Sequence, residues 1–278
     1  MLQREFTEEQ NMFRDAYRKF LATEIVPQME AWREAGIVDR KAFLSAVQQG
    51  LRMVWPEEKY GGMGDDDFRF EQIIIEETAY ARASDWYNTL HSRLVGPYFT
   101  RFGNEEQCQR FLPGCVTGEL ILAIAMTEPD AGSDLAGMRS TAIEQDDHWV
   151  LSGSKTYISN GINADVVIVA AKTDPENNPH HMTLFLVERG MEGFERGRNL
   201  EKMGLKAQDT AELFFNDVKV PKANVLGEPG KGFIYLMEGL AEERLLGAAG
   251  YIATAQLSWD LTAEFVRERK AFGKPLAA

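Results

Sequence analysis

Cysteine is rare in this sequence, with two among 278 residues. Cys108 and Cys115 lie on either side of a Pro-Gly pair, and neither their number nor their spacing supports a disulfide framework or a metal cluster. The adjacent His180 and His181 also lack the spacing of metal ligands on a helix. We therefore expect a reducing compartment and no bound metal.

Positive charge is scarce as well. The 30 lysines and arginines are outnumbered by 43 aspartates and glutamates, which gives a net charge of −13. Nucleic-acid binding needs a basic surface that replaces the counterions of the phosphates, so we expect no nucleic-acid partner. An anionic ligand would have to meet a local group of cations.

Long hydrophobic runs are absent. The apolar run at 166–171 is typical, and it is far shorter than the roughly 20 residues that cross a bilayer, so we expect no membrane span. The segment 1–10, MLQREFTEEQ, has acidic residues and no apolar core, which argues against a secretory signal or a transit peptide. We expect a cytoplasmic location in a bacterium or, alternatively, the mitochondrial matrix after processing.

Helical periodicity dominates residues 1–119. Phe13, Tyr17 and Phe20 recur at helical spacing behind Thr7 and Gln10, a pair with the spacing of a capping box. Candidate starts of further helices are Asp39, Asp67, Ser84 and Asn104, and candidate ends are Gly50 and Gly103. We predict an all-helical N-terminal domain over these 119 residues.

Residues 120–232 change to short β-rich runs separated by Gly, Asp and Asn turns. The runs cover 120–126, 149–151, 166–170, 182–187 and 213–220. This pattern predicts a compact sheet domain. Beyond Gly232 the sequence becomes helical again, and 233–269 predicts one or two long helices in which Gly247 and Gly250 would permit close contact with a neighbour.

The segment 124–134, IAMTEPDAGSD, directly follows the first of these apolar runs. Its Thr, Pro, Gly and Ser residues supply a sharp turn with hydroxyl donors. The segment 155–161, KTYISNG, places an aromatic ring and a further hydroxyl at the end of another strand. Such loops suit a flavin, although for Thr127 and Ser133 ordinary turn chemistry remains the alternative.

Two adjacent carboxylates stand out in the last helical region. The segment 240–250, LAEERLLGAAG, places Glu242, Glu243 and then Arg244 among leucines. A carboxylate on an apolar helix face should have a raised pKa and act as a better base. The two glutamates point about 100° apart around a helix, so both should not face one cleft. A solvated charged face is the alternative for all three residues.

Together with KMGLKAQDTAELFF at 202–215 and RKAFGK at 269–274, these segments resemble the acyl-CoA dehydrogenase family, most closely its long-chain members. The resemblance covers essentially the whole chain. It implies an α+β multidomain protein with an N-terminal helical domain at 1–119, a barrel-like central β-sheet domain at 120–232 and, at 233–278, the start of a C-terminal four-helix bundle.

The activity implied by the resemblance is FAD-dependent α,β-dehydrogenation of medium- or long-chain acyl-CoA thioesters to trans-2-enoyl-CoA in fatty-acid β-oxidation. Glu243 matches the catalytic base of the long-chain and isovaleryl members, whereas most members place the base further along the chain. Electrons would pass to an electron-transferring flavoprotein. The alternatives are an acyl-CoA oxidase of the same fold, and a non-catalytic acyl-CoA-binding or scaffold module or inactive fragment.

The resemblance also implies binding residues. Those for FAD are Ile124, Ala125, Met126, Thr127, Ser133, Tyr157, Ile158, Ser159, Arg269 and Phe272, and those for the acyl-CoA substrate are Ser133, Glu242 and Arg244. Thr127 would donate near flavin N1 and O2, Ser159 would donate toward N5, and Tyr157 would pack on the ring. Arg269 and Phe272 would reach the FAD of an adjacent subunit, which implies a homo-oligomer, a tetramer in the intact family.

The last segment carries an expectation of its own. With most of a four-helix domain missing, the apolar stripe of 233–272 would lack partners, and isolated monomers rarely tolerate such a patch. We therefore expect self-association, or helices beyond Gly232 that are displaced or disordered.

Overall fold

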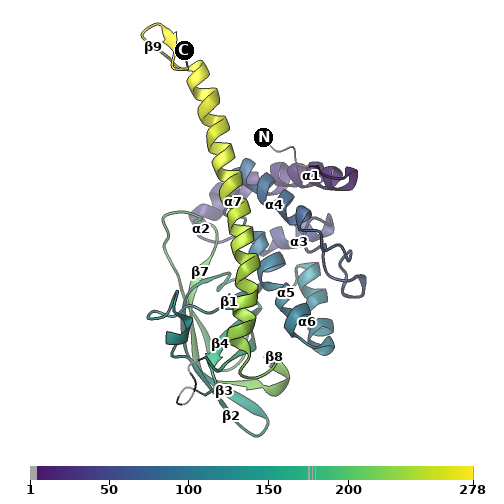
Figure 1. Cartoon of the computed structure of the whole chain (residues 1–278), viewed down its shortest axis with the longest axis vertical. Helices are drawn as coiled ribbons and strands as arrows, with labels where there is room; N and C mark the ends of the chain where they lie inside the picture. Colours follow the sequence, from purple (N-terminus) through teal and green to yellow (C-terminus); the bar gives the residue numbers. More distant parts are fainter. Residues whose placement is uncertain (1–4, 175, 177, 179, 278) are drawn as a thin grey trace.

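The computed structural model describes residues 5–174, 176, 178 and 180–277. It has a helical N-terminal part, a central mixed sheet and a single long C-terminal helix, as predicted. Figure 1 shows that the last helix, α7, runs past both the sheet and the N-terminal helices and then projects beyond them.

Polar caps at several predicted positions define the N-terminal helices. Their bounds are α1 Glu8–Phe20, α2 Met29–Ala35, α3 Arg40–Gln48, α4 Phe68–Tyr80, α5 Pro97–Phe102 and α6 Glu105–Thr117, with π-helical turns η1 at Leu21–Ile25 and η4 at Leu90–Val95. Short 3₁₀ turns are η2 Val26–Gln28, η3 Glu58–Tyr60, η5 Leu135–Gly137 and η6 Lys222–Asn224. Thr7 and Asn104 form capping boxes, and Asp39 and Asp67 cap α3 and α4.

Two of the predicted helix signals are wrong or only partly right. Ser84 caps no helix, because it lies in a turn that follows Arg82, whose φ is 56°, and the next helical turn begins only at Asn88. Gly50 adopts the predicted left-handed conformation behind α3, with φ 66°. Gly103 ends α5 but is extended, with φ −77° and ψ 165°.

The sheet is open, so the expectation of a barrel-like domain is wrong. Its strands are β1 Leu122–Ala125, β2 Thr141–Glu144, β3 His148–Ser159, β4 Val166–Lys172, β5 Met182–Glu188, β6 Phe194–Asn199, β7 Thr210–Pro221 and β8 Val225–Leu226. They are ordered β6-β7-β3-β2-β4-β5-β8, and β1 pairs in parallel with β4. Within the described residues β6 and β8 form two unjoined edges, and closing a sheet would require them to pair.

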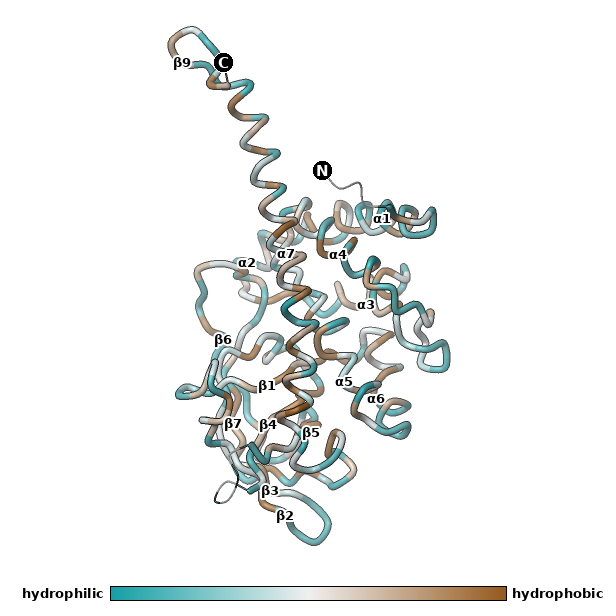
Figure 2. The backbone as a smooth tube through the Cα atoms, viewed as in Figure 1, coloured by the Kyte–Doolittle hydropathy of each residue, from teal (hydrophilic) through white to brown (hydrophobic). Residues whose placement is uncertain are grey.

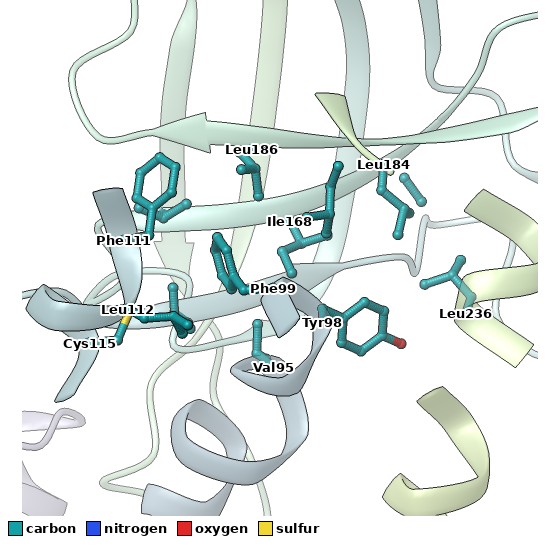
Figure 3. Packing of buried hydrophobic residues seen from close by; sticks show 14 of the residues in the cluster. Val95, Tyr98, Phe99, Phe111, Leu112, Cys115, Ile168, Leu184, Leu186 and Leu236 are labelled. Carbon is teal, nitrogen blue, oxygen red and sulfur yellow. The ribbon is translucent and has the colours of Figure 1, made fainter. Parts of the chain in front are cut away.

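The side chains of strand β4 show that both faces of the sheet are covered. Val166, Ile168 and Ala170 pack into a core that includes the N-terminal helices, whereas Val167 and Val169 pack into a second core on the opposite face. Figure 3 shows the first of these cores, in which residues of η4, α5 and α6 meet side chains of β4 and β5. A strand buried on both faces explains the continuous apolar run in the sequence.

Helix α7, Gly232–Glu268, is continuous over 37 residues, and its two halves differ. Its buried residues are Gly232, Leu236, Gly239, Leu246 and Ala253, all in the first 22 residues, where the helix packs on α4, η4 and β5. Further along, large apolar side chains remain exposed, including Trp259 at 71% and Phe265 at 58%. Figure 2 shows apolar residues along the projecting part. A short hairpin follows, of β9 Lys270–Ala271 and β10 Lys274–Pro275.

Two glycines bring α7 close to other elements, Gly232 next to the Met182 carbonyl of β5 and Gly239 next to α5. A Cβ at Gly239 would lie 2.1 Å from the Tyr98 hydroxyl, whereas at Gly250 the nearest atom is 3.7 Å away, at ordinary contact distance. Gly247 would meet only Tyr251 of its own helix. The prediction that Gly247 and Gly250 permit close contact is therefore wrong.

Candidate active site

The loop after β1 is tied to β3 by a buried lysine. Lys155 donates from Nζ to the carbonyl of Met126 at 3.1 Å and to Oε1 of Glu128 at 2.8 Å. In the same place the backbone N–H of Thr156 donates to the carbonyl of Thr127 at 3.0 Å. These contacts fix the start of the loop against the strand that carries the second predicted segment.

Glu128 and Lys155 form an ion pair in the protein interior, with side chains 5% and 0% exposed. The carboxylate also accepts the backbone N–H groups of Arg139 and Ser140 at the end of the loop. Burial opposes the ionised form, yet the charge and hydrogen bond of Lys155, with the further donors, hold the pKa of Glu128 below its ordinary value. This pair was not predicted.

Tyr157 sits in a strained backbone conformation with its ring in solvent. The β3–β7 register shifts between Lys155 and Ile158, which makes a β-bulge, and Tyr157 within it has a φ of 58°. Its side chain is 68% exposed, whereas Ile158 is buried in the sheet core. A bulky residue held at positive φ marks a place where surrounding contacts impose strain, and such places cluster at ligand sites.

The end of β3 is fixed by hydrogen bonds of Asn160, the residue that follows the strand. Asn160, with a φ of 61°, donates to the carbonyl of Leu122 at 3.0 Å and accepts from Gln208 at 2.8 Å. These bonds fix the half-buried Ser159 close to the start of β1. Among the described residues, no hydrogen bond engages the hydroxyls of Ser159 or Thr127, so both can face a ligand.

The remaining predicted FAD residues of this region differ in exposure. Ala125 is buried in β1, Ile124 and Met126 are half-buried, and Ser133 is exposed on the loop. An open hollow of about 610 Å³ lies beside the same loop, and Glu128, Asp130, Ser140, Gly153 and Phe214 are among its lining residues. Neither Tyr157, Ser159 nor Glu243 lines it, so the predicted flavin position lies outside this hollow.

Glu243 is half-buried on α7. Burial raises the pKa of this carboxyl, and a hydrogen bond from Tyr98 and the charge of Arg244 act against that rise. The Tyr98 hydroxyl lies 3.5 Å from Oε1 of Glu243. The predicted direction of the pKa is thus confirmed, although its expected surroundings are only partly present, because Leu246 is buried and Leu245 is exposed.

Glu242 is shared between two arginines. Its carboxylate accepts from Nε of Arg93 at 2.6 Å and also pairs with Arg101, while Arg93 pairs in addition with Asp66. Burial would raise the pKa of Glu242, but the two guanidinium groups together hold it below its ordinary value. The solvated-face alternative is therefore wrong for this residue. Both glutamates reach the η4–α5 region, contrary to the expectation that only one would face inward.

Three predicted site residues are exposed, and two of them, Arg269 and Phe272, are remote from the loop. Arg244 is exposed, and no hydrogen bond or ion pair joins it to another described residue. Arg269 caps the C-terminal end of α7, and Phe272 is fully exposed in the β9–β10 hairpin. Figure 1 shows this hairpin at the end of α7 that is remote from the sheet, so the described chain does not bring these two residues to the loop.

The described residues contain neither a candidate metal site nor a candidate membrane-spanning helix. Over the described part of the chain, no group of three or more His, Cys, Asp or Glu side chains could hold a metal ion. Both cysteines are buried and free. Among the described helices, none combines the length and the apolar composition that a membrane span requires.

Comparison with known proteins gives matches along the whole chain. Residues 7–119, 123–218 and 230–278 match family models described as the acyl-CoA dehydrogenase N-terminal, middle and C-terminal domains. The mitochondrial long-chain specific acyl-CoA dehydrogenase of Sus scrofa is 46% identical over 278 residues, which is 99% of this chain and 64% of that protein. The chain therefore spans less than two thirds of the length of this relative.

Solved structures agree with the sequence matches. An acyl-CoA dehydrogenase from Geobacillus kaustophilus has a TM-score of 0.95 and 49% identity, covering 99% of this chain and 72% of its own. One from Bacillus anthracis, solved in complex with FAD, has a TM-score of 0.89 and 32% identity, covering 98% and 47%. The helical part, the open sheet and α7 are thus all features of one known architecture, and this chain belongs to the acyl-CoA dehydrogenase family.

Proposed function

We propose that this protein catalyses the FAD-dependent α,β-dehydrogenation of acyl-CoA thioesters to trans-2-enoyl-CoA. The observation that carries the proposal is Glu243, a half-buried carboxylate with a raised pKa on the helix that packs against both other parts of the chain. We propose the segments 1–119, 120–232 and 233–278 as the domains of the enzyme.

Glu243 acts as the base that removes the α-proton of the thioester. A carboxylate with a pKa nearer to neutral accepts a proton more effectively, and general bases of this kind contribute roughly 10²- to 10⁴-fold to a rate. Its neighbour Glu242 is a poor alternative, because two arginines hold its carboxylate ionised and occupied. The ion pairs of Glu242 also anchor α7 to the N-terminal helices directly beside the base.

The residues around the β1 loop fit a flavin. Tyr157 offers an exposed aromatic ring for stacking, and Thr127 and Ser159 offer hydroxyls that have no hydrogen-bond partner among the described residues. When bound, FAD supplies the acceptor for the hydride that leaves the β-carbon. A hydroxyl donor such as Thr127 favours negative charge that develops next to it, and the Lys155 contacts fix its position beforehand. The relative from Bacillus anthracis that was solved with FAD supports this assignment.

The proposed substrate contacts are two exposed side chains, the Arg244 guanidinium on α7 and the Ser133 hydroxyl on the loop after β1. We propose that Arg244 and Ser133 contact the CoA part of the substrate, and that Glu242 contributes through the arginines it holds. The chain carries a net charge of −13, so a local cation is needed where an anionic ligand binds. We further propose a medium- or long-chain substrate and a role in β-oxidation, because a long-chain specific enzyme is among the relatives.

The partners and location follow the same reasoning. We propose an electron-transferring flavoprotein as the electron acceptor and a homo-oligomer in which Arg269 and Phe272 reach the FAD of a neighbouring subunit. The exposed position of these two residues beyond the rest of the chain suits contact with another subunit. A bacterial cytoplasm or a mitochondrial matrix would suit the protein.

The flavin absorbance spectrum tests the proposal. The purified FAD-loaded protein should be yellow and should be bleached under anaerobic conditions by acyl-CoA thioesters, and a series of chain lengths gives the preference. Glu243→Gln should bleach at least about 100-fold more slowly. Glu238→Gln is the matched control, because Glu238 is exposed on the same helix and should not matter. Normal bleaching in Glu243→Gln would contradict the proposal, and rapid reoxidation by air would indicate an oxidase instead.

A further inference from the structure

The ring of Tyr98 is held at one defined place in the core. Tyr98 lies in α5 and is 1% exposed, and its ring meets Phe102 edge to face with centroids 5.6 Å apart. Phe102 in turn stacks on Tyr235 of α7 at 4.3 Å. Figure 3 shows the Tyr98 hydroxyl at the margin of the cluster, on the side of Leu236 and α7. The ring is therefore packed, and its polar end faces the helix that carries Glu243.

Gly239 makes room for that hydroxyl. A Cβ at this position would lie 2.1 Å from the Tyr98 oxygen, so no other residue type fits unless the tyrosine moves. Gly239 precedes Glu243 by four positions, and residues spaced in this way share one face of a helix. The hydroxyl over Gly239 thus lies one turn before the carboxylate, 3.5 Å from Oε1 of Glu243.

We propose that Tyr98 is a positioning residue for Glu243, whose hydroxyl donates a hydrogen bond that orients the carboxylate and favours its ionised form. This inference rests on the proposed role of Glu243 as the base. Burial raises the pKa of the Tyr98 phenol far above neutral, even though the charge of Arg101 opposes that rise, so the hydroxyl remains a donor. A separation of 3.5 Å is long for such a bond, and hydrogen bonds at catalytic sites often shorten when substrate binds.

The other groups near Glu243 do not supply the hydrogen bond that orients its carboxylate. Arg244, the next residue on α7, acts on the carboxylate through its charge. Tyr87, in the turn before η4, does not shift Glu243; instead burial, followed by the charges of Glu71 and Glu243, raises the pKa of Tyr87. Glu242 is neutralised by its two arginines. Of the groups that the structure describes, Tyr98 is the one that donates a hydrogen bond to Glu243. Removing its hydroxyl should therefore raise the pKa of Glu243, because burial would then act with less opposition.

The test is Tyr98→Phe, which keeps the packed ring and removes the hydroxyl. The protonation midpoint of Glu243 is read by difference infrared titration, with Glu243→Gln identifying its band, and kcat/KM is measured against pH on the FAD-loaded protein. We expect the midpoint to rise by about half to one pH unit. Below the midpoint, kcat/KM should fall about three- to tenfold, and its plateau at high pH should be kept.

Tyr60→Phe is the matched control, because Tyr60 also donates to a glutamate, Oε2 of Glu105 at 2.7 Å, in the same helical part of the chain. It should leave both the midpoint and the pH profile unchanged. Gly239→Ala is a second route to the same result, since the added methyl group would displace the hydroxyl, and it should raise the midpoint as well. A melting curve establishes that each variant is folded.

The outcomes separate this inference from the proposed function. An unchanged midpoint in both Tyr98→Phe and Gly239→Ala, or an equal shift in Tyr60→Phe, would overturn the positioning role even if the wild-type protein oxidises acyl-CoA. If the midpoint shifts as expected but the wild-type protein does not oxidise acyl-CoA, the contact between the two residues stands and the dehydrogenase function falls.

Discussion

The two sides of the proposed site are built in different ways. On the sheet side, the loop after β1 is fixed by a buried ion pair, and the bulge that presents Tyr157 is closed by hydrogen bonds from Lys155 before it and Asn160 after it. On the α7 side, the first part of the helix is packed and carries Glu243, whereas the second part exposes large apolar side chains such as Trp259.

This difference indicates which side of the site keeps its shape through contacts within the chain alone. On the sheet side, the buried charges of Glu128 and Lys155 are paired with each other, and the strained bulge is held by its own neighbours, so this side needs no contact from outside the chain to hold its shape. On the α7 side the last buried residue is Ala253, and from Tyr251 onward large apolar side chains are exposed along the helix. An exposed apolar stripe of this kind is normally covered in the functional assembly. Substitutions on the sheet side should therefore change the free energy of unfolding, whereas substitutions on the exposed part of α7 should change self-association.

The largest effect is expected from Lys155→Met on the sheet side. This change leaves the Glu128 carboxylate buried without its cation, which should lower the free energy of unfolding by about 3–5 kcal/mol. Lys222→Met removes the cation of an exposed pair with Glu144 and should cost about 0–1 kcal/mol. Urea unfolding curves measure both, and equal losses in the two variants would show that the buried pair does not hold the loop.

The same pair has a pH dependence that can be checked. The folded protein holds the pKa of Glu128 below its ordinary value, so this stabilisation is present above the ordinary pKa, about 4.3, and is lost as the pH falls through the lower folded value. In Lys155→Met the backbone donors of Arg139 and Ser140 remain, but burial acts on the carboxyl without the opposing charge of Lys155, so the carboxyl takes up a proton at a higher pH than in the wild type. The gap in unfolding free energy between wild type and variant should therefore shrink toward low pH, and a gap that widens would contradict this.

An intermediate effect is expected on the α7 side. Ile252 and Trp259 lie seven positions apart on one face of the exposed part of the helix. Ile252→Lys with Trp259→Lys should weaken self-association of the chain by roughly tenfold or more, because each apolar side chain contributes about 1.5–3 kcal/mol when buried. Thr254→Lys with Ser258→Lys adds the same charge on another face and should have little effect. Sedimentation velocity over a concentration series measures this, and a wild-type protein that stays monomeric throughout would contradict it.

The smallest effect is expected from Tyr157→Gly. Glycine tolerates the φ of 58°, so the free energy of unfolding should rise by up to about 1 kcal/mol, while loss of the stacking ring should weaken FAD binding several-fold. Leu205→Gly relieves similar strain, at a φ of 47°, away from the loop contacts and should leave FAD affinity unchanged. Thermal melts and flavin fluorescence titrations separate the two effects. Unchanged FAD affinity in Tyr157→Gly would remove the ring from the flavin site.

The parts of the fold that could be predicted from sequence are those fixed by local chemistry. Thr7, Asp39, Asp67 and Asn104 cap helices as predicted, because a side-chain oxygen next to free backbone N–H groups is a local signal. Ser84 carries the same signal and fails, since the chain turns at Arg82 before a π-helical segment that no periodicity reveals. The open form of the sheet depends on which strands pair, and strand pairing is not a local property.

The site likewise has features that local sequence predicts and features that depend on residues distant in the sequence. The direction of the Glu243 pKa could be predicted, because leucines surround it in sequence, but the partners of Glu242 could not, since Arg93 and Arg101 are far away along the chain. Two missed residues did leave a signal. Lys155 occupies an inward-facing position in the alternation of β3, where a charge requires a partner, and Gly239 interrupts a helical run one turn before the base.

The most direct test concerns proton removal itself. With the flavin already reduced, so that net oxidation cannot proceed, the protein in D₂O should exchange the α-hydrogen of a saturated acyl-CoA for deuterium, which mass spectrometry detects. We predict that Glu243→Gln slows this exchange by about 10²- to 10⁴-fold and that Glu238→Gln leaves it unchanged. Exchange at the wild-type rate in Glu243→Gln would show that another group removes the proton, and Glu243 would no longer be the base.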